Sequence, residues 1–131
     1  MNPETPRKIL CVEDDEDIRM VLELALSAGG FSAAVCGSGA EALERAADFH
    51  PDLLLLDVMM PGMDGPATLR ALRKLPQTGK TPAIYLTAKV QPAEVREYLA
   101  GGACAVIPKP FDPIKLPERI KEIWRETCAG K

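Results

Sequence analysis

The feature that most constrains this chain is a run of four leucines, Leu53 to Leu56, followed by Asp57 and a cluster of turn-forming residues. An apolar run of this length, ended by turn signals, is typical of a strand buried on both faces in a parallel sheet. Because such a strand has no polar face, we expect Asp57 at its carboxyl end. Open α/β sheets bind ligands outside the carboxyl ends of their strands. The pattern therefore predicts an acid at a binding edge, although capping of the next turn is the usual role of an aspartate there.

Shorter apolar runs alternate with helical patterns along the rest of the chain. The other predicted strands are residues 7–12, 31–36, 83–86 and 104–107. This alternation predicts an α/β fold, a doubly wound, flavodoxin-like sheet of five parallel strands in the order 2-1-3-4-5. We expect a single domain over residues 1–131, with its core at about residues 8–127. Pro117 predicts an irregular start for the last helix, which we expect from about Ile114 to Thr127.

Composition excludes several classes of protein. The 131 residues are 47% hydrophobic and 27% charged, which is typical of a globular chain. A net charge of −3 argues against binding to a nucleic-acid backbone. No apolar run approaches the roughly 20 residues of a membrane span, and residues 1–8 contain no secretory signal. The four cysteines lie far apart without a CxxC motif, so we interpret them as reduced thiols in a cytoplasmic protein.

Two local patterns have structural explanations. The segment from Gly37 through Gly39 to Ala42 matches a dinucleotide-binding fingerprint, but it follows the second predicted strand rather than the first. The chain also holds only about half of a dinucleotide fold, so we interpret the two glycines as a turn and a helix entry. His50 precedes Pro51 in a predicted loop and has no cysteine or histidine near it in sequence, so we expect it at the surface.

Polar side chains follow four of the five predicted strands. They are Glu13 and Asp14, Asp57, Thr87, and Lys109. In the order 2-1-3-4-5 the three acids converge between the first and third strands, with Thr87 and Lys109 beside them. Crowded carboxylates repel one another, and a bound divalent cation relieves that repulsion. Oxygen ligands favour Mg²⁺, and a cation, a lysine and a hydroxyl around one carboxylate predict a phosphoryl group carried on Asp57.

With these residues the chain resembles the receiver domains of two-component response regulators, and the single-domain chemotaxis regulators among them. The resemblance extends from about Lys8 to Trp124. Each motif is short, but their order and their places on the predicted elements make the resemblance specific. The matching motifs are Val12-Glu13-Asp14-Asp15, the segment from Leu56-Asp57 to Asp64-Gly65, Leu86-Thr87-Ala88 and Lys109-Pro110-Phe111.

The resemblance implies a role for each acid. Asp57 would accept a phosphoryl group from a phosphohistidine on a sensor histidine kinase or a phosphotransfer protein. Mg²⁺ would bind Asp14 and Asp57 directly, Glu13 directly or through a water, and Met59 through its backbone carbonyl. The protein would not be an enzyme acting on a separate substrate. It would be a signalling phosphoacceptor that catalyses its own phosphoryl transfer and a slow self-dephosphorylation.

The resemblance also implies how the signal leaves the site. Thr87 would bind a phosphoryl oxygen, and Lys109, before a cis bond to Pro110, would pair with the phosphoryl group. Phosphorylation would then switch an interaction face for a downstream output protein. The family usually carries an aromatic residue three positions before the lysine, whereas this chain has Val106. The fifth predicted strand also lacks the family's usual acids, so we expect a monomer or a weak dimer.

Two alternative functions compete with the phosphorylation switch. A phosphatase of the haloacid-dehalogenase type uses an aspartyl nucleophile, but it needs a second acid two residues later, where this chain has Met59. A degenerate receiver would only bind partners, which the complete set of acids, Thr87 and Lys109 argues against. Phosphorylation by a small phosphodonor with Mg²⁺ distinguishes the switch from the degenerate receiver.

Overall fold

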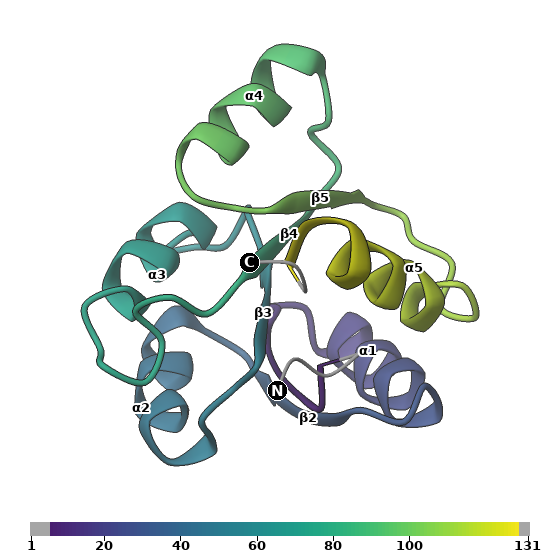
Figure 1. Ribbon diagram of the computed structural model, residues 1–131, viewed down its shortest axis with the longest axis horizontal. Helices are drawn as coiled ribbons and strands as arrows, with labels where there is room; N and C mark the ends of the chain where they lie inside the picture. The colour runs from purple at the N-terminus through teal and green to yellow at the C-terminus, as the bar shows by residue number, and fades with distance from the viewer. Residues whose placement is uncertain (1–5, 129–131) are drawn as a thin grey trace.

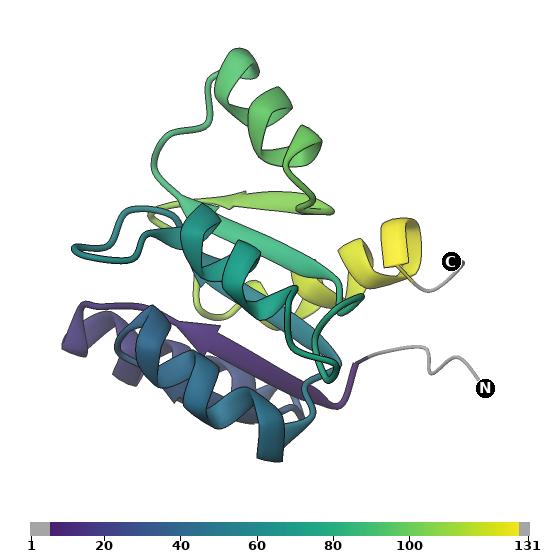
Figure 2. The same ribbon diagram turned by 90° about the vertical axis from the view of Figure 1, so that its left-hand side faces the viewer.

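The computed structural model describes residues 6–128, in which five parallel strands form one sheet with helices on both faces (Figures 1 and 2). Strands and helices alternate along the chain, as the sequence predicts. The elements are β1 (Lys8–Val12), α1 (Glu16–Ala28), β2 (Ser32–Cys36), α2 (Gly39–Phe49), β3 (Leu53–Asp57), α3 (Gly65–Leu72), β4 (Ala83–Thr87), α4 (Pro92–Ala100), β5 (Ala105–Pro108), α5 (Leu116–Ile123) and a π-helical turn η1 (Trp124–Cys128).

The strand order is β2-β1-β3-β4-β5, which confirms the predicted topology. β3 lies at the centre of the sheet, where Leu55 pairs with Cys11 on one side and with Ile84 on the other. All five residues of β3 are buried, as expected for a strand with no polar face. The reversal of strand order therefore falls between β1 and β3, at the end of the leucine run.

Alternate residues of the strands pack into two separate cores. On one face Leu53 and Leu55 pack with residues of α1 and α5, and on the other Leu54 and Leu56 pack with residues of α2 and α3. Figure 1 shows these two pairs of helices on opposite sides of the sheet. α4 contributes no buried residue and lies over the β5 edge of the sheet. α1, α2, α3 and α5 are thus anchored by buried apolar residues, whereas α4 packs on the core through the partly buried Tyr98.

The segment that resembles a dinucleotide fingerprint has a packing role. Ser38 caps α2, and its side chain accepts a hydrogen bond from the amide of Glu41. A Cβ atom on Gly39 would overlap Oγ1 of Thr68 and lie 2.7 Å from Sδ of Met63, so only glycine allows α2 to pack this closely against α3 and the preceding loop. The interpretation as a turn and helix entry is confirmed. His50 is exposed and ends α2 in a left-handed conformation, with φ of 53°.

The last helix differs most from the prediction. α5 begins at Leu116 rather than near Ile114, with Pro117 in its first turn, where a missing N–H costs least. Cys11 and Cys36 are buried in the two cores, and neither forms a disulfide. The side chain of Cys128 lies outside the described part of the structure. Among the described residues, no helix has both the length and the apolar character needed to span a membrane.

Candidate functional site

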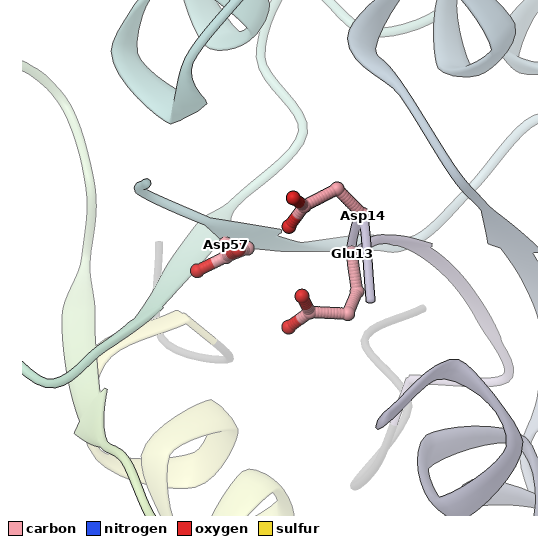
Figure 3. A group of neighbouring side chains, drawn as sticks. All are labelled: Glu13, Asp14 and Asp57. Carbon is pink, nitrogen blue, oxygen red and sulfur yellow. The ribbon is translucent and has the colours of Figure 1, made fainter. Parts of the chain in front are cut away.

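Three carboxylates meet at the edge where β1 and β3 end (Figure 3). Glu13 and Asp14 directly follow β1, and Asp57 is the last residue of β3. One carboxylate oxygen from each residue lies within 4.8 Å of the others. The side chains of Glu13 and Asp57 are buried, with 1% and 3% of their surfaces exposed, whereas Asp14 is exposed. The predicted convergence of the three acids is therefore confirmed.

Lys109 reaches this cluster from the loop after β5. Its Nζ lies 2.7 Å from Oε1 of Glu13 and 3.1 Å from Oδ1 of Asp57. The peptide bond between Lys109 and Pro110 is cis, and the amide of Lys109 donates a hydrogen bond to the carbonyl of Thr87 at 2.9 Å. The structure thus places the predicted lysine against the predicted phosphoacceptor.

Thr87 ends β4 beside Asp57, since Asp57 pairs with Leu86 across the two strands. Its side chain is buried, and its hydroxyl oxygen accepts a hydrogen bond from the amide of Lys89 at 3.0 Å. The hydroxyl hydrogen therefore stays available to donate to an incoming oxygen. Met59 lies two residues beyond Asp57, with 57% of its side chain exposed.

Burial and charge determine the protonation of the site. Burial raises the pKa of Glu13 and of Asp57, and the hydrogen bond from Lys109 opposes this shift only in part. Burial disfavours the charge on Lys109, but its hydrogen bonds to the two acids outweigh that effect and raise its pKa. Three carboxylates and one ammonium leave a formal charge of −2 when all are ionised. That charge and the oxygen donors fit a divalent cation such as Mg²⁺.

Arg19 belongs to the site, although the sequence analysis did not identify it. Its Nη1 donates hydrogen bonds to the backbone carbonyls of Glu13 and Asp14, each at 2.9 Å. The amide of Asp15 donates to Oε2 of Glu13 at 3.2 Å, so the loop after β1 is held from two sides. The only signal in the sequence is a basic residue at the beginning of a helix whose preceding residues are acidic.

Comparison with known protein families identifies the family of this chain. The family model of the response regulator receiver domain matches residues 9–121 of the sequence. This chain belongs to the response regulator receiver family. Receiver domains are signalling modules of two-component systems, so the fold, the family and the phosphoacceptor geometry of the site agree.

Named relatives and solved structures agree with the assignment. The DNA-binding response regulator MtrA of Mycobacterium tuberculosis (strain ATCC 25618 / H37Rv) is 39% identical over 121 residues, which cover 92% of this chain and 52% of MtrA. The phosphate regulon transcriptional regulatory protein PhoB of Rhizobium meliloti is 40% identical over 120 residues, covering 92% of this chain and 53% of PhoB. This chain therefore spans about half the length of these relatives. The chemotaxis response regulator CheY4 of Vibrio cholerae superposes with a TM-score of 0.83 at 32% identity, over 91% of this chain and 99% of that chain.

One position departs from the usual receiver pattern. Val106, where the family commonly has an aromatic residue, pairs with Tyr85 of β4 and is only partly buried. Tyr85 is buried and meets Tyr98 of α4 edge to face, with ring centroids 5.4 Å apart and planes at 78°. The aromatic residue of the sheet that contacts α4 is thus Tyr85 of β4, whereas β5 has Val106 at the paired position.

Proposed function

We propose that this receiver domain accepts a phosphoryl group on Asp57 from a phosphohistidine of a sensor histidine kinase or phosphotransfer protein. The reaction requires Mg²⁺ and takes place in the cytoplasm, and phosphorylation switches a protein-interaction face. The observation that carries this proposal is the surroundings of Asp57, a buried carboxylate hydrogen-bonded to Lys109 and within 4.8 Å of Glu13 and Asp14. An acid with only a capping role would face solvent and backbone amides instead.

The residues around Asp57 divide the chemistry among them. An Asp57 carboxylate oxygen forms a bond to phosphorus as the bond from phosphorus to the donor imidazole breaks, and the electron pair of that bond returns to the imidazole. Asp14, Asp57, Glu13 and the Met59 carbonyl would hold Mg²⁺, which would supply positive charge against the charge of the phosphoryl oxygens. Positioning and charge compensation of this kind are most of what phosphoryl transfer requires.

Lys109 and Thr87 complete the binding of the phosphoryl group. Lys109 already sits 3.1 Å from Asp57 with its charge favoured by two acids, so it can pair with a phosphoryl oxygen without large movement. The Thr87 hydroxyl has its oxygen occupied by the Lys89 amide and can donate its hydrogen to another phosphoryl oxygen. A shift of Thr87 toward the phosphoryl group would move the loop to α4, because both Lys89 and the start of α4 follow directly.

Metal removal tests this function most directly. With acetyl phosphate and Mg²⁺ we expect intact-mass analysis to show one added phosphate, and with excess EDTA we expect none. Phosphorylation that is equally fast without a divalent cation would refute the metal-dependent mechanism. Absence of phosphorylation under both conditions would favour the degenerate receiver.

The phosphorylated form should lose its phosphate slowly. Hydrolysis needs a water in line with the Asp57–phosphoryl bond, and Met59 and Lys89 lie two residues beyond Asp57 and Thr87, where they flank its path in this family. The thioether of Met59 is too weak a hydrogen-bond acceptor to orient the water, and a charged Lys89 cannot accept the proton of the water. We expect Met59→Asn combined with Lys89→Glu to accelerate decay about tenfold, or ~1.4 kcal/mol of barrier. Radiolabel decay measures this, with the exposed pair Met20→Asn and Lys74→Glu as control. Equal decay rates would show that Met59 and Lys89 do not control the water.

An exposed apolar patch beside the site supports a protein as the phosphodonor. The side chains of Leu24 and Ile114 are 70% and 87% exposed. Leu24 and Ile114 line a groove of about 530 Å³, which shares Val21 with a second groove of about 410 Å³ that reaches Lys109. A phosphohistidine protein that reaches Asp57 would cover this surface, and exposed apolar patches mark such contacts.

A pair of charged substitutions tests the patch. We expect Leu24→Glu with Ile114→Glu to slow transfer from a kinase that phosphorylates the wild-type protein by about tenfold or more, since burying a charge against an apolar partner is costly. Phosphorylation by acetyl phosphate should not change, because the site is intact. The matched control is Val90→Glu with Leu99→Glu, which alters exposed apolar residues near α4. Equal slowing by both pairs would contradict a donor surface on α1.

We propose that α4 and β5 form the output face. α4 and β5 carry exposed or partly buried apolar residues, among them Val106 and Leu99, that can contact a downstream protein. β5 contains no acid, so we propose a monomer or a weak dimer rather than a charge-paired dimer. A net charge of −3 favours a protein rather than a nucleic-acid backbone as the partner of this domain.

A further inference from the structure

We infer that Arg19 is a positioning residue for the magnesium ligand Asp14, an inference that rests on the proposed metal site. Nη1 of Arg19 donates to two carbonyls at once, those of Glu13 and Asp14, both at 2.9 Å. These carbonyls belong to the peptide planes on either side of the Asp14 Cα atom. Holding both planes fixes φ and ψ of Asp14, and therefore the direction in which its side chain leaves the backbone.

Asp14 depends on this contact more than the other two acids do. Glu13 is held through its side chain by Lys109 and by the amide of Asp15, and Asp57 is held by Lys109. Within residues 6–128, by contrast, the Asp14 carboxylate has neither a hydrogen bond nor an ion pair, and it is exposed. Its place within 4.8 Å of the other two acids is therefore set by its backbone. Ligands that are held in place before the metal arrives bind it more tightly.

The surroundings of Arg19 hold its guanidinium in place. The side chain is partly buried and lies against Gly37, where a Cβ atom would come within 3.0 Å of Nη1. The amide of Gly37 in turn donates to Oε1 of Glu41 at 2.8 Å, which fixes the turn between β2 and α2. Gly37 thus makes room for the arginine, whose guanidinium packs against this turn.

Whether Mg²⁺ affinity rises or falls in Arg19 variants distinguishes a positioning role of Arg19 from an effect of its charge. Removing a positive charge near three carboxylates should by itself strengthen Mg²⁺ binding. Loss of positioning should weaken it, by roughly tenfold, as is typical for partners that orient metal ligands. A weaker Mg²⁺ affinity in Arg19 variants therefore cannot come from the lost charge.

Calorimetric titration of the intact protein with Mg²⁺ alone tests the inference. We expect Kd to rise roughly tenfold in Arg19→Met and in Arg19→Gln, whose amide is too short to reach both carbonyls. Arg73→Met is the matched control, because Nη1 of Arg73 also donates to two carbonyls, those of Thr78 and Thr81, after α3. We expect that variant to melt at a lower temperature while its Kd stays at the wild-type value.

The outcomes are distinct. An unchanged or lower Kd in whichever Arg19 variant folds overturns the positioning role, as does an equal rise in the Arg73 variant. A wild-type protein that does not bind Mg²⁺ overturns the proposed metal site and, with it, the need for positioning. Weaker binding in Arg19→Gln with a melting temperature no lower than that of Arg73→Met supports the inference.

Discussion

Replacing Asp57 by asparagine is expected to abolish phosphorylation. An asparagine side chain has nearly the same shape, and its oxygen can still accept the hydrogen bond from Lys109, so the fold should be retained. It has no anionic oxygen to attack phosphorus, and none of the other acids is so placed. Both carboxylate oxygens of Glu13 already accept hydrogen bonds, Oε1 from Lys109 and Oε2 from the Asp15 amide, whereas Lys109 donates to Asp57 at Oδ1, and Asp14 is exposed. Intact-mass analysis after treatment with acetyl phosphate and Mg²⁺ should show one phosphate on the wild type and none on the variant.

Asp52→Asn provides the matched control for this result. Oδ2 of Asp52 accepts hydrogen bonds from the amides of Arg7 and Lys8, at the edge of the sheet opposite the site. Asparagine can preserve these contacts, so phosphorylation should match the wild type. Label on Asp57→Asn at the wild-type level would show that another residue is the phosphoacceptor.

The fold could be predicted because the leucine run leaves few alternatives. Four apolar residues in a row, ended by turn signals, favour a strand covered on both faces, and that strand became the centre of the sheet. The start of α5 was harder to predict. Pro113 and Pro117 bracket it, and the turn in which the amides of Lys115 and Leu116 both donate to the carbonyl of Asp112 has no distinct sequence pattern. The apolar spacing continues through that turn, so it could not mark the boundary.

The members of the site could be predicted better than their contacts. Strand ends predicted which acids converge, because neighbouring parallel strands end at the same edge. The bridge of Lys109 between Glu13 and Asp57 joins residues far apart in the chain and depends on the path of the β5 loop. The role of Arg19 could not be predicted because it binds backbone carbonyls, and every residue has a carbonyl whatever its side chain. The contact between Tyr85 and Tyr98 could not be predicted either, because α4 shows little apolar periodicity from which to infer its packing face.

Asp14→Ala should weaken Mg²⁺ binding while the fold is retained. Asp14 is exposed and its side chain has no partner among the described residues, so its removal costs no packing. Its negative charge raises the pKa of Asp57, although burial is the main cause of that shift, so removing the charge relieves repulsion in the metal-free protein. We expect Mg²⁺ binding to weaken at least a hundredfold and phosphorylation by acetyl phosphate to become undetectable, because the cation loses a charged ligand.

The stability of the metal-free variant provides the sharper test. We expect the free energy of unfolding to rise by roughly 0.5 kcal/mol, which is about 2 °C in melting temperature for a domain of this size. Thermal melts in EDTA measure the change. Glu16→Ala, which removes an exposed acid from the first turn of α1, is the charge-matched control and should slightly lower the melting temperature, because that acid favours the helix start. A clear loss of stability in Asp14→Ala would contradict the crowding of carboxylates, and unchanged Mg²⁺ affinity would remove Asp14 from the metal site.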